Sequence, residues 1–122
     1  MTSYPYIMII DDEPDTQEIL SYNLKREGYE VQTFPNPLPA IESLKQNLPD
    51  LILTDWLMPG MDGLEFTRYL KSNEDVSYIP VIMITCKGDE NDVERALRTG
   101  AQDYLVKPFR IKDLIARIQL FL

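Results

Sequence analysis

Five polar residues stand at the ends of short apolar runs, and together they could bind a metal ion and an anion. Asp11 and Asp12 follow YIMII, Asp55 follows LILT, Thr85 ends PVIMIT, and Lys107 ends DYLVK. Carboxylates held close together repel one another until a proton or a cation compensates them. A site with oxygen ligands only suits Mg²⁺, which leaves coordination positions open for phosphoryl oxygens.

The same residues supply the groups that phosphoryl transfer requires. Lys107 would place a positive charge, and Thr85 a hydroxyl donor, beside the equatorial oxygens of a phosphoryl group. Asp55, flanked by the acid pair and the lysine, is the candidate nucleophile. The sequence therefore predicts that a rigid strand holds Asp55 as a phosphoryl acceptor.

Each of these residues has a simpler structural interpretation when it is taken alone. Asp12 could be a helix N-cap, and Asp55 could cap a turn. Thr85 could be an ordinary strand-end residue, and Lys107 a solvated charge. Their joint position at the ends of four strands favours a shared site, because separate caps and stray charges have no reason to meet at one edge.

Five apolar runs predict the strands that would position these groups, at residues 6–10, 29–34, 51–54, 80–85 and 103–107. Apolar residues at helical spacing lie between the runs. They are Ile19, Leu20 and Leu24; Ile41, Leu44 and Leu48; Leu64, Thr67 and Leu70; Val93, Ala96 and Leu97; and Ile111, Leu114, Ile115, Ile118 and Leu122. Helix boundaries are indicated by Pro14, Gly28 and Gly100.

Strict alternation of strand and helix predicts a parallel sheet that is covered on both faces. The expected fold is an open, doubly wound α/β domain formed by residues 1–122. In such sheets the ligand site lies outside the carboxyl ends of the strands, which is where the polar residues fall.

Composition excludes several other classes of protein. Twelve basic and twenty acidic residues give a net charge of -8, which disfavours direct binding of nucleic acid. No apolar run approaches the roughly 20 residues of a membrane span. The N-terminal stretch lacks an export signal and Cys86 is the only cysteine, so we expect a cytoplasmic protein. Because the chain contains no histidine, any histidine chemistry must come from a partner.

Four segments resemble the signatures of the receiver domains of two-component response regulators, the group that includes chemotaxis regulators. They are IIDDEPD, LILTDWLMPGMDG, PVIMITC and GAQDYLVKPF, and the similarity extends over essentially the whole chain. The resemblance implies a flavodoxin-like (βα)5 fold with strand order 2-1-3-4-5. It also implies that the donor is a phosphohistidine on a sensor histidine kinase or phosphotransfer protein.

The resemblance assigns a role to each site residue. Asp55 would be phosphorylated, and Mg²⁺ would be held by Asp12, Asp55 and the main-chain carbonyl of Leu57, with Asp11 acting through a bound water. By the same analogy, Thr85 and Lys107 would bind the phosphoryl oxygens. The Lys107-Pro108 bond is expected to be cis. Such a domain is not an enzyme in the ordinary sense, but it assists its own phosphorylation and dephosphorylation.

The family also suggests how phosphorylation would be transmitted. The new charge would draw the Thr85 hydroxyl toward it, and Tyr104 would move into the vacated space. This would shift the population of the face formed by the fourth helix, fifth strand and fifth helix. The alternative interpretation of Tyr104 is an ordinary half-buried strand tyrosine.

A homodimer through that face is a further expectation. The stretch ILSYNLKREGYEV resembles regulators that carry a winged-helix DNA-binding domain and dimerise in this way. Asp103 and Arg117 match one intersubunit pair and Asp113 matches half of another. Val93 and Gln102 replace charged residues, so only part of the expected charge pattern is present.

Three further positions differ from the usual family choices or bear on them. Cys86 replaces a smaller residue, and we expect a packed neutral thiol, with redox sensing as the alternative. Leu57 and Lys87 occupy positions that modulate the attack of water on the acyl phosphate. An apolar Leu57 predicts a phosphorylated state that is not especially short-lived.

Two other functional classes share part of this pattern. A phosphohydrolase of the haloacid dehalogenase type would need a second aspartate where Leu57 stands, and a cap for which the chain has no spare length. A phosphate-independent receiver-like binding module would not need all five site residues. The P-loop motif G-x-x-x-x-G-K-[ST] does not occur.

Overall fold

A single parallel sheet of five strands runs through the molecule. The computed structural model describes residues 4–122, so residues 1–3 of the N-terminal stretch in which we found no export signal lie outside it. The strands are β1 (Tyr6–Ile10), β2 (Glu30–Phe34), β3 (Leu51–Thr54), β4 (Val81–Thr85) and β5 (Asp103–Val106). They are ordered β2-β1-β3-β4-β5, which confirms the predicted topology. The predicted strand bounds differ from the observed ones by at most one residue.

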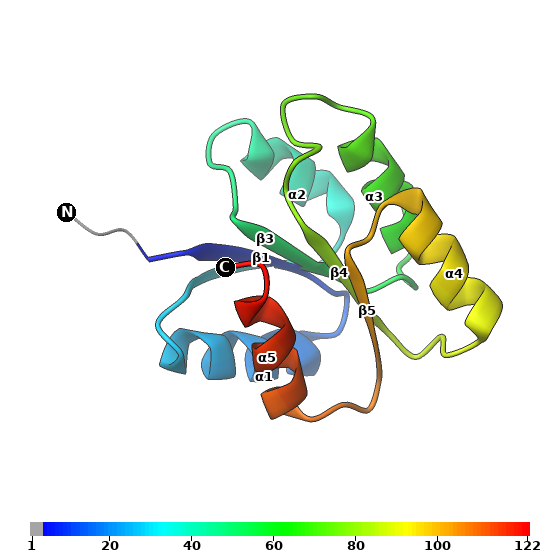
Figure 1. Ribbon diagram of the computed structural model, residues 1–122. Coiled ribbons are helices and arrows are strands. Elements are labelled where there is room, and N and C mark those ends of the chain that lie inside the picture. Colours follow the sequence, from blue (N-terminus) through cyan, green and yellow to red (C-terminus); the bar gives the residue numbers. More distant parts are fainter. Residues whose placement is uncertain (1–3) are drawn as a thin grey trace.

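Five helices cover both faces of this sheet. They are α1 (Pro14–Arg26), α2 (Pro37–Leu44), α3 (Gly63–Lys71), α4 (Glu90–Thr99) and α5 (Ile111–Gln119). Figure 1 shows α1 and α5 on one face and α2, α3 and α4 on the other. Within residues 4–122, no helix is both long enough and apolar enough to cross a membrane.

The burial of the strands explains their composition. Every residue of the three central strands β1, β3 and β4 is buried, whereas the edge strands β2 and β5 are partly exposed. Because successive side chains of a strand point to opposite faces, Ile7 and Ile9 pack with α1 and α5. Met8 and Ile10 pack with α2 and α3. A parallel sheet buried on both sides therefore needs continuous apolar runs.

The helix boundaries follow from local chemistry. Pro14 occupies the first turn of α1, where its missing N–H is not needed. At the start of α3, Asp62 and Glu65 form a reciprocal capping box. Gly28 and Gly100 have φ angles of 96° and 125°, a backbone region that favours glycine after a helix. These features agree with the predicted start and stop signals.

Several apolar residues that fit helical spacing are not part of the core. Leu48 lies beyond the end of α2, and Ile19 on α1 is 56% exposed. Leu97 on α4 and Leu122 beyond the end of α5 are also exposed. Spacing alone cannot distinguish these residues from core residues, because one apolar stripe can extend past the buried side of a helix.

Candidate functional site

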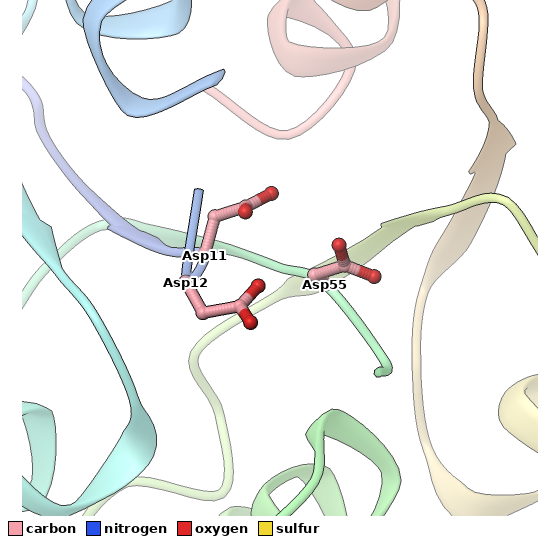
Figure 2. A group of neighbouring side chains, drawn as sticks. All are labelled: Asp11, Asp12 and Asp55. Carbon is pink, nitrogen blue, oxygen red and sulfur yellow. The ribbon is translucent and has the colours of Figure 1, made fainter. Parts of the chain in front are cut away.

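Three carboxylates and one ammonium group meet at the carboxyl edge of the sheet. Asp11 and Asp12 follow β1 and Asp55 follows β3, and one oxygen from each lies within 4.8 Å of the others. Figure 2 shows the three side chains gathered at this edge. The Lys107 Nζ, just after β5, lies 3.0 Å from Asp11 Oδ2 and 2.9 Å from Asp55 Oδ2. The structure thus brings four of the proposed site residues together.

The backbone around the site fixes two of the carboxylates. Asp55 Oδ1 accepts the Trp56 N–H at 2.6 Å and the Leu57 N–H at 3.3 Å, so this residue also caps the turn after β3. Asp11 Oδ1 accepts the Glu13 N–H at 2.9 Å. Asp12 is exposed and is not the N-cap of α1, which is Glu13. The capping interpretation is therefore wrong for Asp12.

The pKa values of Asp11 and Lys107 are both shifted at this edge of the sheet. Burial raises the pKa of Asp11, and this effect exceeds the opposite effects of the Glu13 N–H and Lys107. Burial would lower the pKa of Lys107, but its hydrogen bonds to Asp55 and Asp11 raise that pKa to about 12. Lys107 is consequently an ammonium ion at neutral pH. The interpretation of Lys107 as a solvated charge is wrong, since its side chain is only 15% exposed.

Thr85 lies at the same edge but does not join the ionic cluster. It is fully buried at the end of β4, and its hydroxyl accepts the Lys87 N–H at 3.5 Å. Among residues 4–122, no hydrogen bond links this hydroxyl to the three aspartates. The backbone N–H of Lys107 donates to the Thr85 carbonyl at 2.9 Å, which joins the ends of β4 and β5. The Lys107-Pro108 peptide bond is cis, as the resemblance implies.

Tyr104 on β5 is buried and packs beside the site. Its ring meets Trp56 edge to face at a centroid distance of 6.4 Å, and its hydroxyl donates to the Lys87 carbonyl. Burial raises the pKa of Tyr104 to about 12, and the negative charges of Asp92 and Asp55 add to this effect. Tyr104 is thus more buried than the half-buried strand tyrosine of the simpler interpretation.

Sequence reasoning missed Trp56, whose ring contacts Tyr104, Lys87 and Arg95. It is buried directly after Asp55, and the Lys87 ammonium lies 4.3 Å from the centroid of its ring. Arg95 of α4 lies over the same ring at 6.0 Å. An apolar residue that follows a strand gives no signal of such contacts, because they depend on α4 and on the loop before it.

Gly63 was also missed, although it determines the shape of the loop after Asp55. The Gly63 N–H donates to the Trp56 carbonyl at 2.8 Å. A Cβ atom at position 63 would lie 1.9 Å from the Asp55 carbonyl oxygen. Only glycine permits this approach. The Asp62-Gly63 pair indicates a turn in the sequence, but it does not indicate which backbone the turn will touch.

The family departures have different structural outcomes. Cys86 is exposed, so the expectation of a packed thiol is wrong; the residue falls in the loop beyond the last buried position of β4. The Leu57 side chain is 54% exposed. Within one chain, Arg117 of α5 donates to both carboxylate oxygens of Asp103, at 2.7 and 2.9 Å. Gln102 has a local role, since its side chain accepts the Val81 N–H.

The donor set of the cluster fits a hard divalent cation. Asp11, Asp12 and Asp55 offer carboxylate oxygens only, and no nitrogen or sulfur ligand belongs to the group. The Lys107 ammonium pairs with two of these carboxylates, so three carboxylates share one ammonium group. Such a site can bind a cation and hold an oxygen nucleophile beside it.

Comparisons with known proteins agree with this geometry. Residues 7–119 match the model of the response regulator receiver domain. The chain is 41% identical to the phosphate regulon transcriptional regulatory protein PhoB of Rhizobium meliloti over 118 residues, which are 97% of this chain and 52% of the relative. It is 36% identical to the DNA-binding response regulator MtrA of Mycolicibacterium smegmatis, over 93% of this chain and 48% of the relative. The chain thus spans about half the length of these curated relatives.

A solved structure shows the same architecture. It is the signal receiver domain of a signal transduction histidine kinase from Syntrophus aciditrophicus, with a TM-score of 0.90 and 37% sequence identity. The match covers 97% of this chain and 89% of that one.

Proposed function

We propose, since the chain belongs to the response regulator receiver domain family, that it acts in a phosphorelay by accepting a phosphoryl group on Asp55. One observation carries this proposal. Lys107 bridges Asp55 and Asp11 at the carboxyl edge, with Asp12 beside them. This arrangement supplies a fixed nucleophile, a cation for the incoming group and ligands for a metal ion.

The metal ion would be Mg²⁺. Its ligands would be Asp11, through a water, Asp12, Asp55 and the main-chain carbonyl of Leu57. When bound, Mg²⁺ would neutralise phosphoryl oxygens and so favour their approach to Asp11, Asp12 and Asp55, the carboxylates that we call the acidic edge. The support from this chain is the three clustered carboxylates and the absence of nitrogen and sulfur ligands among them.

In the transfer itself, an Asp55 carboxylate oxygen forms a bond to phosphorus as the bond between phosphorus and the donor nitrogen breaks. By analogy with the receiver-domain family, the donor would be a phosphohistidine of a sensor histidine kinase or phosphotransfer protein, and that histidine must lie outside residues 1–122, which contain none. Lys107, kept protonated by its pKa of about 12, would pair with a phosphoryl oxygen. The Thr85 hydroxyl would donate a hydrogen bond to another oxygen. Asp55 is held in place by the Trp56 and Leu57 N–H groups.

The output would be a change in the packing of Thr85 and Tyr104. Tyr104 already lies inside, against Trp56, and Asp55 contributes to its raised pKa. Additional charge on Asp55 would therefore alter the environment of Tyr104 and shift the population of the α4, β5 and α5 face. A homodimer through this face would have to accommodate the Asp103 and Arg117 pair, which is formed within one chain.

Receiver domains are generally not conventional enzymes. We place this one in the cytoplasm, which is consistent with its response-regulator relatives, as a domain that assists its own phosphorylation and dephosphorylation. The relatives include one named as DNA-binding, and regulation of transcription by a longer protein would be the corresponding biological output. Residues 1–122 would serve as the receiver domain whether or not they are joined to a DNA-binding domain.

Acetyl phosphate provides the test, because it needs no kinase. With Mg²⁺ present, the protein should take up one phosphoryl group per chain, measured by intact mass, and Asp55→Asn should take up none. Asp75→Asn, an exposed aspartate on the loop after α3, is the matched control and should be labelled like the wild type. Release of many equivalents of phosphate would indicate a phosphohydrolase, and absence of uptake by the wild type would indicate a phosphate-independent binding module.

A further inference from the structure

An open groove between α3 and α4 lies outside the site described above. Figure 1 shows the two helices side by side. The groove has a volume of about 520 Å³ and is lined by Arg68, Asn91, Glu94, Arg95, Arg98 and Thr99. We call this surface the arginine groove.

The charge of the arginine groove is opposite to that of the whole chain. It presents three guanidinium groups and one carboxylate, on a protein with a net charge of -8. Arg98 pairs with Glu94. In residues 4–122, Arg68 and Arg95 form no ion pair within 4.0 Å. Two guanidinium groups therefore remain available to an external anion.

The groups and shape of this groove define the class of partner. Guanidinium groups bind carboxylates through two parallel hydrogen bonds. Arg95 and Arg98 are one helical turn apart on α4, and Arg68 faces them from α3, so they can contact successive acidic side chains of one segment. An open groove would not bury most of a small ligand as pockets for such ligands do. An extended phosphate backbone would reach beyond the groove onto the rest of a chain with a net charge of -8, whereas a short acidic segment can stay within the groove.

We propose that the arginine groove docks an acidic segment of a partner protein. A second copy of this chain is disfavoured, because both copies would carry a net charge of -8. The proposal does not depend on phosphorylation of Asp55. Its failure and the failure of the phosphorelay proposal are thus separate results.

The groove is also connected to the acidic edge through one side chain. Arg95 lies over the ring of Trp56, and the backbone N–H of Trp56 donates to Asp55 Oδ1 at 2.6 Å. A partner carboxylate that draws Arg95 toward the groove changes the surroundings of Trp56. Since Trp56 is the only tryptophan of the chain, its fluorescence reports on this contact.

The probe is a short oligoglutamate peptide, and calorimetry is the primary measurement. The wild type should bind it saturably, with weaker affinity at higher ionic strength. Arg68→Glu with Arg95→Glu should weaken binding about tenfold or more, because each reversal converts an attraction into a repulsion. Lys25→Glu with Lys112→Glu changes two exposed lysines on α1 and α5 by the same charge and should have less than about a twofold effect. Circular dichroism verifies that both double variants are folded.

The proposal is supported if the groove variant loses affinity and the lysine variant keeps it. Absence of saturable binding to the wild type would overturn it. An equal loss in both double variants would also overturn it, since only the net charge would then matter. Tighter binding of inorganic pyrophosphate or of a single-stranded oligonucleotide at the same residues would assign the groove to a different ligand class.

Discussion

Replacement of Lys107 by methionine tests the ionic cluster at the acidic edge. Methionine keeps an unbranched side chain of similar length but removes the charge that bridges Asp11 and Asp55. Both carboxylates are buried, so the variant leaves them facing each other without a cation. We expect Lys107→Met to fold but to unfold more readily than the wild type when no metal ion is present.

The size of the effect follows from the pKa of the lysine. Burial would lower this pKa, yet the two hydrogen bonds raise it from 10.5 to about 12. That rise corresponds to about 2 kcal/mol in favour of the folded state. Because the folded pKa exceeds the unfolded one, this stabilisation is fully present below pH 10.5 and is lost as the pH rises through about 12. At neutral pH the variant should therefore lose about 2 kcal/mol of unfolding free energy.

Urea unfolding in the presence of EDTA, followed by circular dichroism, measures this loss. Lys45→Met is the control, because Lys45 forms only an exposed ion pair with Glu42 and its removal should cost less than about 1 kcal/mol. The difference between Lys107→Met and the wild type should shrink in acid, because the pKa of Asp11 is raised and protonation of this carboxyl removes one of the two charges that Lys107 compensates. Equal stability of Lys107→Met and the wild type at neutral pH would refute the reasoning, as would an undiminished difference in acid.

Three other substitutions test neighbouring parts of the account. Asp11→Asn should raise the unfolding midpoint in EDTA and reduce the further stabilisation by Mg²⁺. The sign follows from the raised pKa of Asp11. Because the folded pKa lies above the unfolded value of 3.8, the folded state loses stability as the pH rises from 3.8 through the folded pKa. A lower midpoint for Asp11→Asn would contradict this reasoning. Gly63→Ala should destabilise by about 3 kcal/mol or more in thermal unfolding, because its Cβ would collide with the Asp55 carbonyl. Gly60→Ala, which adds a Cβ in open space at a φ of 78°, should cost about 1 to 2 kcal/mol, and equal losses would argue against the close approach. Tyr104→Phe should lose about 1 kcal/mol in urea unfolding, since it removes the hydrogen bond to the Lys87 carbonyl but keeps the ring, whereas Tyr78→Phe at an exposed position should be neutral.

The sequence was sufficient to predict the fold because its signals are local. Apolar runs such as 51–54 give the strands, and Pro14, Gly28 and Gly100 mark the helix ends. The alternation of these elements then leaves few allowed topologies. Spacing was less informative about burial, as exposed Leu97 shows, because the sequence does not specify which side of a stripe packs.

The site could be predicted only in part. The positions of Asp11, Asp12, Asp55 and Lys107 at strand ends predict a shared site, because parallel strands end at a common edge. The bridging of two aspartates by Lys107, the contacts of Trp56 and the tight approach at Gly63 depend on distances between distant segments. Cys86 was misjudged because its burial depends on the direction that the chain takes after β4.

The position of the phosphoryl group is the most direct test of the central claim. After incubation with acetyl phosphate and Mg²⁺, borohydride reduction of the acyl phosphate followed by peptide mapping identifies the modified residue. We predict a single modified site, Asp55, and none when EDTA replaces Mg²⁺. Modification of Asp11 or Asp12 instead, or labelling that does not depend on the metal ion, would contradict the account.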